Sequence, residues 1–246
     1  MQKFQLFPRL KSSLFLGELI TRGRRQNEFV IRLVNPLQQQ AIRPLTEHNN
    51  VFSLAATLGK AIRASIAHLH KDLYDSTVTS RLLKVLMNTI KVNKLAGVGL
   101  NNGDLSGILR FSFNSKAELA NVMASRPDVY VNRDVSTVRI TVPPFTPGCN
   151  IYGPPRATHY SFLSAAVEFD FESNRFQTSI AGSDSRRLDK QETEPITMGH
   201  SVSPNSRVPI LVMFMIRFSM EKNGLLYPCS ANQQPIRVIE VNNIPV

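Results

Sequence analysis

The sequence predicts an α+β protein, with N-terminal short strands and a helical hairpin followed by a mainly antiparallel β-sandwich-like domain. Three patterns lead to this prediction. Apolar residues alternate with polar ones over residues 1–35, recur every three or four positions over 46–95, and fall in short alternating segments after 104. With 42% hydrophobic and 19% charged residues, the 246-residue chain can bury enough apolar surface to fold.

The first 35 residues predict two or three short strands. A turn-like polar stretch at 22–27 separates them, and Pro36 ends the pattern. The alternating apolar positions are Phe4 and Leu6, Leu14 and Leu16, and Phe29, Ile31 and Leu33.

Two helices are predicted next, close enough in the chain to pack as a pair. The first begins at Thr46, whose hydroxyl can cap free amides, and the second runs from Ser80 to Leu95, with Gly97 near its end. The expected buried stripes are Phe52, Ala55, Leu58, Ile62, Ile66, Leu69 and Leu73 in the first helix and Leu82, Leu83, Leu86, Met87 and Ile90 in the second.

Short strands dominate after residue 104. Alternation predicts strands over Ile108–Phe113 and Val138–Val142, and Ile236–Val241 is expected to be the last strand. Between the first two, Ser115 and Glu118 have the spacing of a capping box and predict a short helix.

Two further strands differ in how they are expected to be buried. Phe162–Glu172 places Val167, Phe169 and Phe171 on an inner face and Glu168, Asp170 and Glu172 on a solvated acidic face. Val208–Phe218 is apolar on both faces, as in a central strand covered on both sides.

Both the charge and the pattern of apolar residues change near residue 100, where glycine and asparagine residues at 97–104 indicate turns. Residues 1–100 carry 15 basic and 5 acidic side chains, whereas residues 101–246 carry 14 and 13, so the excess of +11 lies mostly in the first part. We therefore divide the chain into a basic N-terminal strand arm and helical hairpin (1–100) and a β-rich, sandwich-like domain (101–246).

No residue pattern predicts a catalytic, cofactor-binding or metal site. The sequence lacks the glycine-rich phosphate loops and nucleophile elbows of common enzymes. His68 and His70 point to different sides of a helix, and His159 and His200 are expected to be structural. Cys149 and Cys229 are expected to be unpaired thiols rather than a disulfide. We expect a protein without enzyme activity or cofactor, although a site built across a subunit boundary would leave no local motif.

The basic excess suggests a partner surface. Basic residues at helical spacing, together with those of the 22–27 turn, can line a positive surface for a polyanion, or be merely the solvated faces of amphipathic helices. This surface comprises Arg22, Arg24, Arg25, Lys60, Arg63, Arg81, Lys84, Lys91 and Lys94.

The order of these segments resembles that of uncharacterised Bacteroidota proteins of unknown function. The resemblance rests on Arg43-Pro44-Leu45-Thr46, Phe52-Ser53-Leu54-Ala55, Gly59-Lys60-Ala61-Ile62-Arg63, and the run from Ala157-Thr158-His159-Tyr160 through Ala165–Asp170 to Val208-Pro209-Ile210. It implies no activity, ligand or catalytic residue.

The expected function is that of a non-enzymatic structural subunit that self-assembles into a filament, tube or particle through its N-terminal strands and sheet edges. The alternative is a nucleic-acid-binding or packaging protein using the basic helical surface.

Expected partners are copies of the chain, or nucleic acid or another polyanion. The longest apolar run, Val208–Ile216, is too short to cross a bilayer, and Glu18 interrupts the only early apolar stretch, so we expect a soluble chain made in the cytoplasm without a classical signal peptide.

Overall fold

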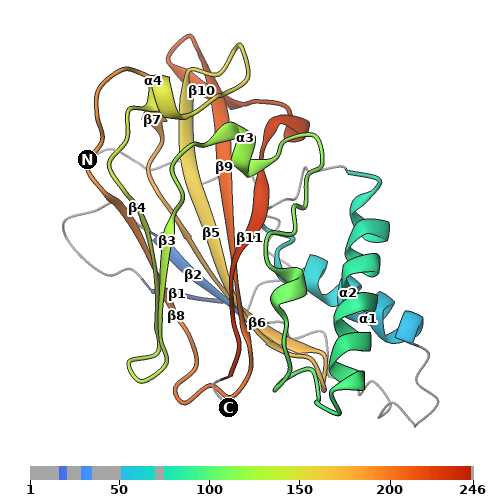
Figure 1. Cartoon of the computed structure of the whole chain (residues 1–246). Coiled ribbons are helices and arrows are strands. Elements are labelled where there is room, and N and C mark those ends of the chain that lie inside the picture. Colours follow the sequence, from blue (N-terminus) through green and yellow to red (C-terminus); the bar gives the residue numbers. More distant parts are fainter. Residues whose placement is uncertain (1–16, 21–28, 35–50, 70–74, 245–246) are drawn as a thin grey trace.

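The computed structural model describes residues 17–20, 29–34, 51–69 and 75–244 (Figure 1). Its helices are α1 (Val51–Ser65), α2 (Val78–Leu95), α3 (Leu119–Val122) and α4 (Pro147–Asn150), with short 3-10 turns η2 (Ser106–Ile108) and η3 (Ala231–Gln233). Its strands are β1 (Gly17–Ile20), β2 (Phe29–Val34), β3 (Asp128–Asn132), β4 (Thr137–Val142), β5 (His159–Asp170), β6 (Arg175–Gly182), β7 (Arg186–Arg187), β8 (Ile196–Ser201), β9 (Ile210–Lys222), β10 (Leu225–Pro228) and β11 (Ile236–Asn242).

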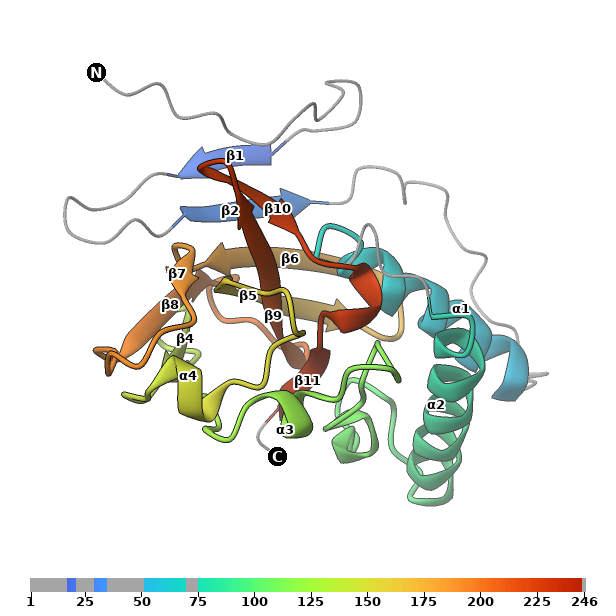
Figure 2. The ribbon, with the colours of Figure 1, turned by 90° about the horizontal axis from the view of Figure 1, so that it is seen from above.

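The described strands form two antiparallel sheets. The larger sheet has the order β1-β2-β6-β5-β9-β10, with β11 also paired to β9 and β7 to β5, and the smaller has the order β3-β4-β8. Helices α1 and α2 pack on one face of the larger sheet and the smaller sheet packs on the other (Figures 1 and 2). This arrangement confirms the predicted α+β fold class.

Strand β9 is an interior strand of the larger sheet, with β5 on one side and β10 and β11 on the other. It pairs with β5 without interruption from His159↔Ser219 to Glu168↔Ile210. Leu211 and Met213 enter the core beneath the helices, while Val212 and Phe214 enter the core between the two sheets. The prediction that this segment is covered on both faces is therefore confirmed.

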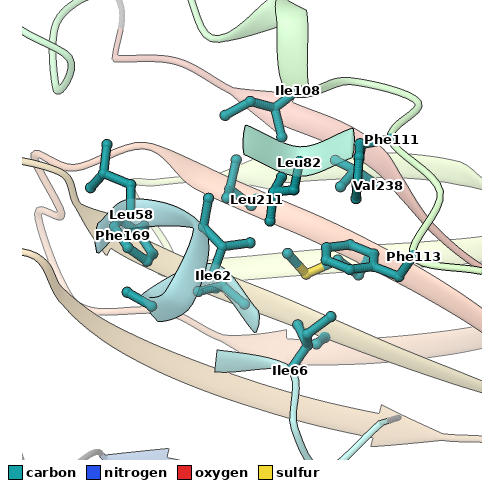
Figure 3. Close-up of a cluster of buried hydrophobic side chains, with 14 of the residues drawn as sticks. Leu58, Ile62, Ile66, Leu82, Ile108, Phe111, Phe113, Phe169, Leu211 and Val238 are labelled. Atoms are coloured by element: carbon teal, nitrogen blue, oxygen red, sulfur yellow. The ribbon is translucent and has the colours of Figure 1, made fainter. Parts of the chain in front are cut away.

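The helical pair packs on the larger sheet through one core cluster. Leu58 and Ile62 of α1 and Leu82 of α2 meet Phe169 and Leu211 of the sheet (Figure 3). The predicted stripe of α1 is buried from Ala55 to Leu69, but Phe52 is 53% exposed. Thr46 and Leu73 lie outside the described residues.

The N-terminal strands extend the same sheet. β2 pairs with β6 from Phe29↔Gly182 to Val34↔Gln177, and β1 pairs with β2. The part of the chain before residue 100 thus joins the later residues twice, through this strand pairing and through the shared helical core. The predicted alternations at 4–6 and 14–16 lie outside the described residues.

Two local predictions between residues 106 and 122 were wrong in part, although the short helix expected before Met123 is present as α3. The segment Ile108–Phe113 begins in η2 and passes through Arg110 at φ 68°, so the run beside β11 is limited to residues 110–113. There the Arg110 N–H donates to Val238 O at 3.0 Å and the Phe113 N–H donates to Ile236 O at 2.9 Å. The capping box does not form, because the Ser115 N–H donates to Asp75 Oδ2 at 2.9 Å and the N-cap of α3 is Glu118, without a side-chain cap bond.

The predicted solvated acidic face of β5 is wrong at Glu168, which is 5% exposed. The smaller sheet covers this face of β5, so solvent does not reach the carboxylate. Its Oε2 accepts hydrogen bonds from the Ser203 N–H at 2.8 Å, the Ser203 hydroxyl at 3.0 Å and the Gln177 amide at 3.2 Å. These bonds offset part of the cost of burying the charge.

Candidate interaction surfaces

The helical layer carries positive charge without negative charge. Neither α1 nor α2 contains Asp or Glu. Lys60 of α1 and Lys84, Lys91 and Lys94 of α2 are all exposed. On α2, Lys91 and Lys94 follow Lys84 by seven and ten residues, which places them about 10 Å and about 15 Å from Lys84 along the helix axis. We call these four residues the lysine face.

Two arginines of the predicted surface are instead engaged within the fold. The Arg81 guanidinium binds Asp75 Oδ2 at 2.7 Å and Ser112 O at 2.7 Å, and it lies 5.2 Å from the centre of the Phe111 ring. Arg63 donates to Thr79 Oγ1 at 2.9 Å and so links α1 to the start of α2. Both arginines therefore hold the helical layer together.

Asp75 is the acidic partner in this junction. Burial raises its pKa, but hydrogen bonds from the Ser115 N–H and from Thr77 outweigh that effect and hold the pKa well below its usual range. The carboxylate is thus charged at neutral pH and fixes both Arg81 and the 112–115 segment. Arg22, Arg24 and Arg25 lie outside the described residues.

A partly buried polar cluster around Arg133 holds the C-terminal strand in place. Arg133 donates to Asn242 Oδ1 at 3.0 Å, to Asn242 O at 3.1 Å and to Ser206 O at 2.9 Å. Burial lowers the pKa of Arg133, while the charge of Glu168 acts in the opposite direction. The arrangement holds the end of β11 against the loop before β9, which is a structural task.

Two of the described histidines, His159 and His200, contact other residues of the fold. His200 is buried between the sheets, with Nδ1 3.1 Å from Ser179 O and Nε2 2.9 Å from Ser164 Oγ. His159 Nε2 lies 3.9 Å from Glu221 Oε2. Across the described ranges, no group of three or more His, Cys, Asp or Glu side chains is placed to hold a metal ion. His48 and His70 are not among the described residues.

The β9–β10 hairpin forms one edge of the larger sheet, at the top of Figure 1 and remote from α1 and α2. Consecutive large apolar side chains of β10 are exposed: Leu225 by 60%, Leu226 by 44% and Tyr227 by 47%. Among the described residues, no strand or loop pairs with the outer side of β10, whereas the neighbouring β11 is covered by residues 110–113. An unpaired edge with apolar side chains is a typical docking element for another strand.

An open hollow of about 330 Å³ lies at the base of this hairpin. It is bounded by Met220, Pro228 and Cys229 and by the loop at 154–156. Burial raises the pKa of the Cys229 thiol, which keeps it in the less reactive protonated form. Both cysteines are free, in agreement with the expectation of unpaired thiols. The hollow therefore offers a contact surface rather than an activated nucleophile.

The hairpin was missed at the sequence level. Its turn residues Asn223 and Gly224 both have positive φ, at 53° and 74°, as a two-residue type I′ turn requires. An Asn-Gly pair between apolar residues is a strong hairpin signal, so the hairpin itself could have been predicted. Its exposure at the sheet edge could not, because that depends on which strands pair elsewhere.

Comparison of the chain with protein-family models, with curated proteins and with solved structures finds no match. No helix within the described ranges is both long and apolar enough to span a membrane.

Proposed function

We propose that the protein is a non-enzymatic structural subunit that assembles with copies of itself into a filament, tube or particle through its N-terminal strands and sheet edges. The observation that carries this proposal is the apolar, unpaired edge of β10. Monomeric proteins usually blunt such edges with charged residues or proline, keep them short, or cover them. β10 is short and ends in Pro228, but it contains no charged residue, and its exposed apolar side chains suit contact with protein.

Among the described strands, β1 stands at the opposite end of the strand order of the same sheet and pairs with β2 alone. A sheet with an open strand at each end can join neighbouring copies at two places, which an extended assembly requires. The strands β1 and β2 belong to the N-terminal arm, residues 1–35, on which the proposal relies for the second contact.

Light scattering after size-exclusion chromatography, together with negative-stain microscopy, tests this function. The full chain is expected to show a mass above that of the monomer that rises with protein concentration, and ordered particles or filaments. Deletion of residues 1–35 is expected to abolish the ordered assemblies, because it removes β1 and β2.

A deletion of residues 1–16 serves as the control, since it leaves β1 and β2 in place. Assembly by this variant and not by the longer deletion assigns the contact to the two strands. The proposal is contradicted if the full chain stays monomeric at high micromolar concentration and the longer deletion leaves the oligomeric state unchanged.

The lysine face favours nucleic-acid binding as a second candidate function. Its exposed lysines have no acidic residue on their own helices to neutralise them, so phosphate groups could take that role. Such binding weakens with salt, because each phosphate contact releases counterions.

Charge reversal at Lys84, Lys91 and Lys94 is expected to lower affinity for nucleic acid at low salt. It should also reduce the slope of log K against log salt by about 2 to 3, at about 0.7–0.9 for each lost phosphate contact. Fluorescence anisotropy with labelled single-stranded and duplex oligonucleotides across a salt series measures both quantities. The matched control reverses exposed Arg175, Arg186 and Lys190, which changes net charge equally but lies outside the helices. Equal effects of the two triple variants, or no detectable binding at low salt, exclude the lysine face as the site.

A further inference from the structure

The backbone of the β9–β10 hairpin determines which groups its edge offers. Lys222 and Leu225 flank the two-residue turn and are opposite each other, so their N–H and C=O groups face one another. Because this orientation alternates along a strand, the N–H and C=O of Leu226 point away from β9. Pro228, two positions further on, also points outward but has no N–H to offer.

The side chains of β10 divide between the two faces of the hairpin. Leu225 and Tyr227 share a face with Lys222 and Met220, their partners on β9. Leu226 lies on the other face, opposite Glu221. Each face of the edge thus carries an exposed apolar group next to unpaired backbone.

We propose that β10 pairs antiparallel with β10 of a second copy of this chain, across a two-fold axis at Leu226. In this register Leu226 faces Leu226 of the second copy, and the two residues exchange both backbone hydrogen bonds. Leu225 of each copy then faces Tyr227 of the other, an aliphatic–aromatic pair of the kind that stabilises antiparallel strands. All three exposed apolar side chains of the edge gain a partner.

The position of Pro228 favours a second copy over an unrelated peptide. In the proposed register Pro228 faces Gly224 of the second copy, at the end of the paired segment. Its missing N–H therefore costs a hydrogen bond only at the two ends of the paired segment. A longer peptide that ran past the edge would lack a hydrogen-bond donor opposite Pro228 in the middle of its pairing with β10.

Charge also favours self-pairing at this strand. Copies of a chain with a net charge of +11 repel each other, and β10 is an uncharged stretch in which approach is least opposed. The nearest lysine, Lys222, lies on β9 opposite Leu225, one strand away from the proposed contact. Added salt is therefore expected to strengthen the pairing, the reverse of its effect on nucleic-acid binding.

This inference rests on the proposed self-assembly and names one of its contacts. A two-fold contact closes on itself, so it yields a dimer whose growth needs another edge. The pairing would make the two larger sheets continuous through β10 and leave β1 free at each end.

Disulfide trapping tests the register. In a background with Cys149→Ser and Cys229→Ser, a Leu226→Cys variant places two thiols on directly opposed residues whose Cα atoms are about 5.5 Å apart, within disulfide reach. The control is Leu225→Cys in the same background, for which the two Cα atoms would lie about 8 Å apart, beyond that reach. Under mild oxidation we expect at least a tenfold higher initial rate of covalent dimer formation for Leu226→Cys, with a further rise in salt. Equal rates for the two variants overturn the proposal.

A second variant gives a readout without cross-linking. Leu226→Lys is expected to leave the fold intact, because the side chain is already exposed, and to weaken the dimer at least tenfold in sedimentation velocity, because it puts two cations face to face. If the full chain still assembles while Leu226→Lys has no effect and Leu226→Cys does not cross-link, the self-assembly stands and the β10 contact is rejected. A chain that remains monomeric throughout, without cross-linking, rejects both.

Discussion

Replacing Phe214 by alanine is expected to lower the free energy of unfolding by about 3–5 kcal/mol, the largest effect of a single substitution that we predict. Phe214 lies in the interior strand β9 with none of its side chain exposed. Its ring centre is 5.1 Å from that of Phe162 on the neighbouring strand β5, in the core between the two sheets. Removing the ring leaves a cavity that rigid strands on both sides cannot close.

Urea unfolding followed by circular dichroism measures this effect as a lower midpoint at an unchanged slope. A domain is typically stable by only about 5–15 kcal/mol, so the variant is expected to be partly unfolded at 37 °C if the protein lies near the lower limit. The matched control is Tyr152→Ala, which removes an aromatic ring that is 65% exposed and should cost less than about 0.5 kcal/mol. Similar midpoints for the two variants would mean that the two sheets do not pack against each other around Phe214.

The burial of β9 and that of Glu168 show what a sequence pattern can predict. A strand that is apolar at every position needs a cover on both faces, so the two-sided burial of residues 210–216 follows from the residues alone. Alternation on β5 correctly puts Glu168 on the face opposite Val167, but it does not say what covers that face. The cover comes from strands at 128–142 and 196–201, and its position is a property of the whole fold.

The basic surface was predictable only in part: the exposure of its lysines was, but the partners of its arginines were not. Helical spacing correctly indicates that Lys84 and Lys91 are exposed on α2. The same spacing groups Arg81 with them, whereas the structure ties its guanidinium to Asp75 and Ser112. Ser112 is 31 residues away in the chain, and only the packing of the 110–113 segment beside α2 brings its carbonyl to the arginine. Local sequence can assign a charge to a helix face but not the partner that engages it.

His200 is expected to make the protein less stable as the pH falls from about 6.5 towards 4. Its Nδ1 faces Ser179 O, which can only accept, so Nδ1 carries the proton and the Ser164 hydroxyl donates to Nε2. The ring is therefore neutral in the fold. Burial lowers the pKa of His200 to about 4, and the hydrogen bond to Ser179 opposes this shift only in part.

The direction of this pH dependence follows from how many protons the folded and the unfolded chain bind. Between pH 6.5 and 4 the unfolded chain binds a proton at His200 that the folded chain does not, so the free energy of unfolding decreases as the pH falls. The full shift from 6.5 to about 4 corresponds to about 3 kcal/mol. Asp75, Asp104 and Asp170 have lowered pKa values in the fold, so protonating them in acid also lowers the free energy of unfolding. This loss begins only near pH 4, where carboxylates of the unfolded chain take up protons. The window from pH 6.5 to 4.5 thus separates the histidine from these carboxylates.

His200→Gln removes the titrating ring and keeps an amide able to donate to Ser179 and accept from Ser164. The variant is expected to lose some stability at pH 7 through imperfect packing. Its free energy of unfolding should then change by about 2–3 kcal/mol less than that of the wild type between pH 6.5 and 4.5. Urea titrations at half-unit pH intervals give both curves, and parallel curves over this window would show that His200 takes up its proton equally well in the folded and unfolded chain. Because the ring joins β8 to β5 and β6 between the two sheets, a difference in slope would also place the acid-sensitive step at the contact between the sheets.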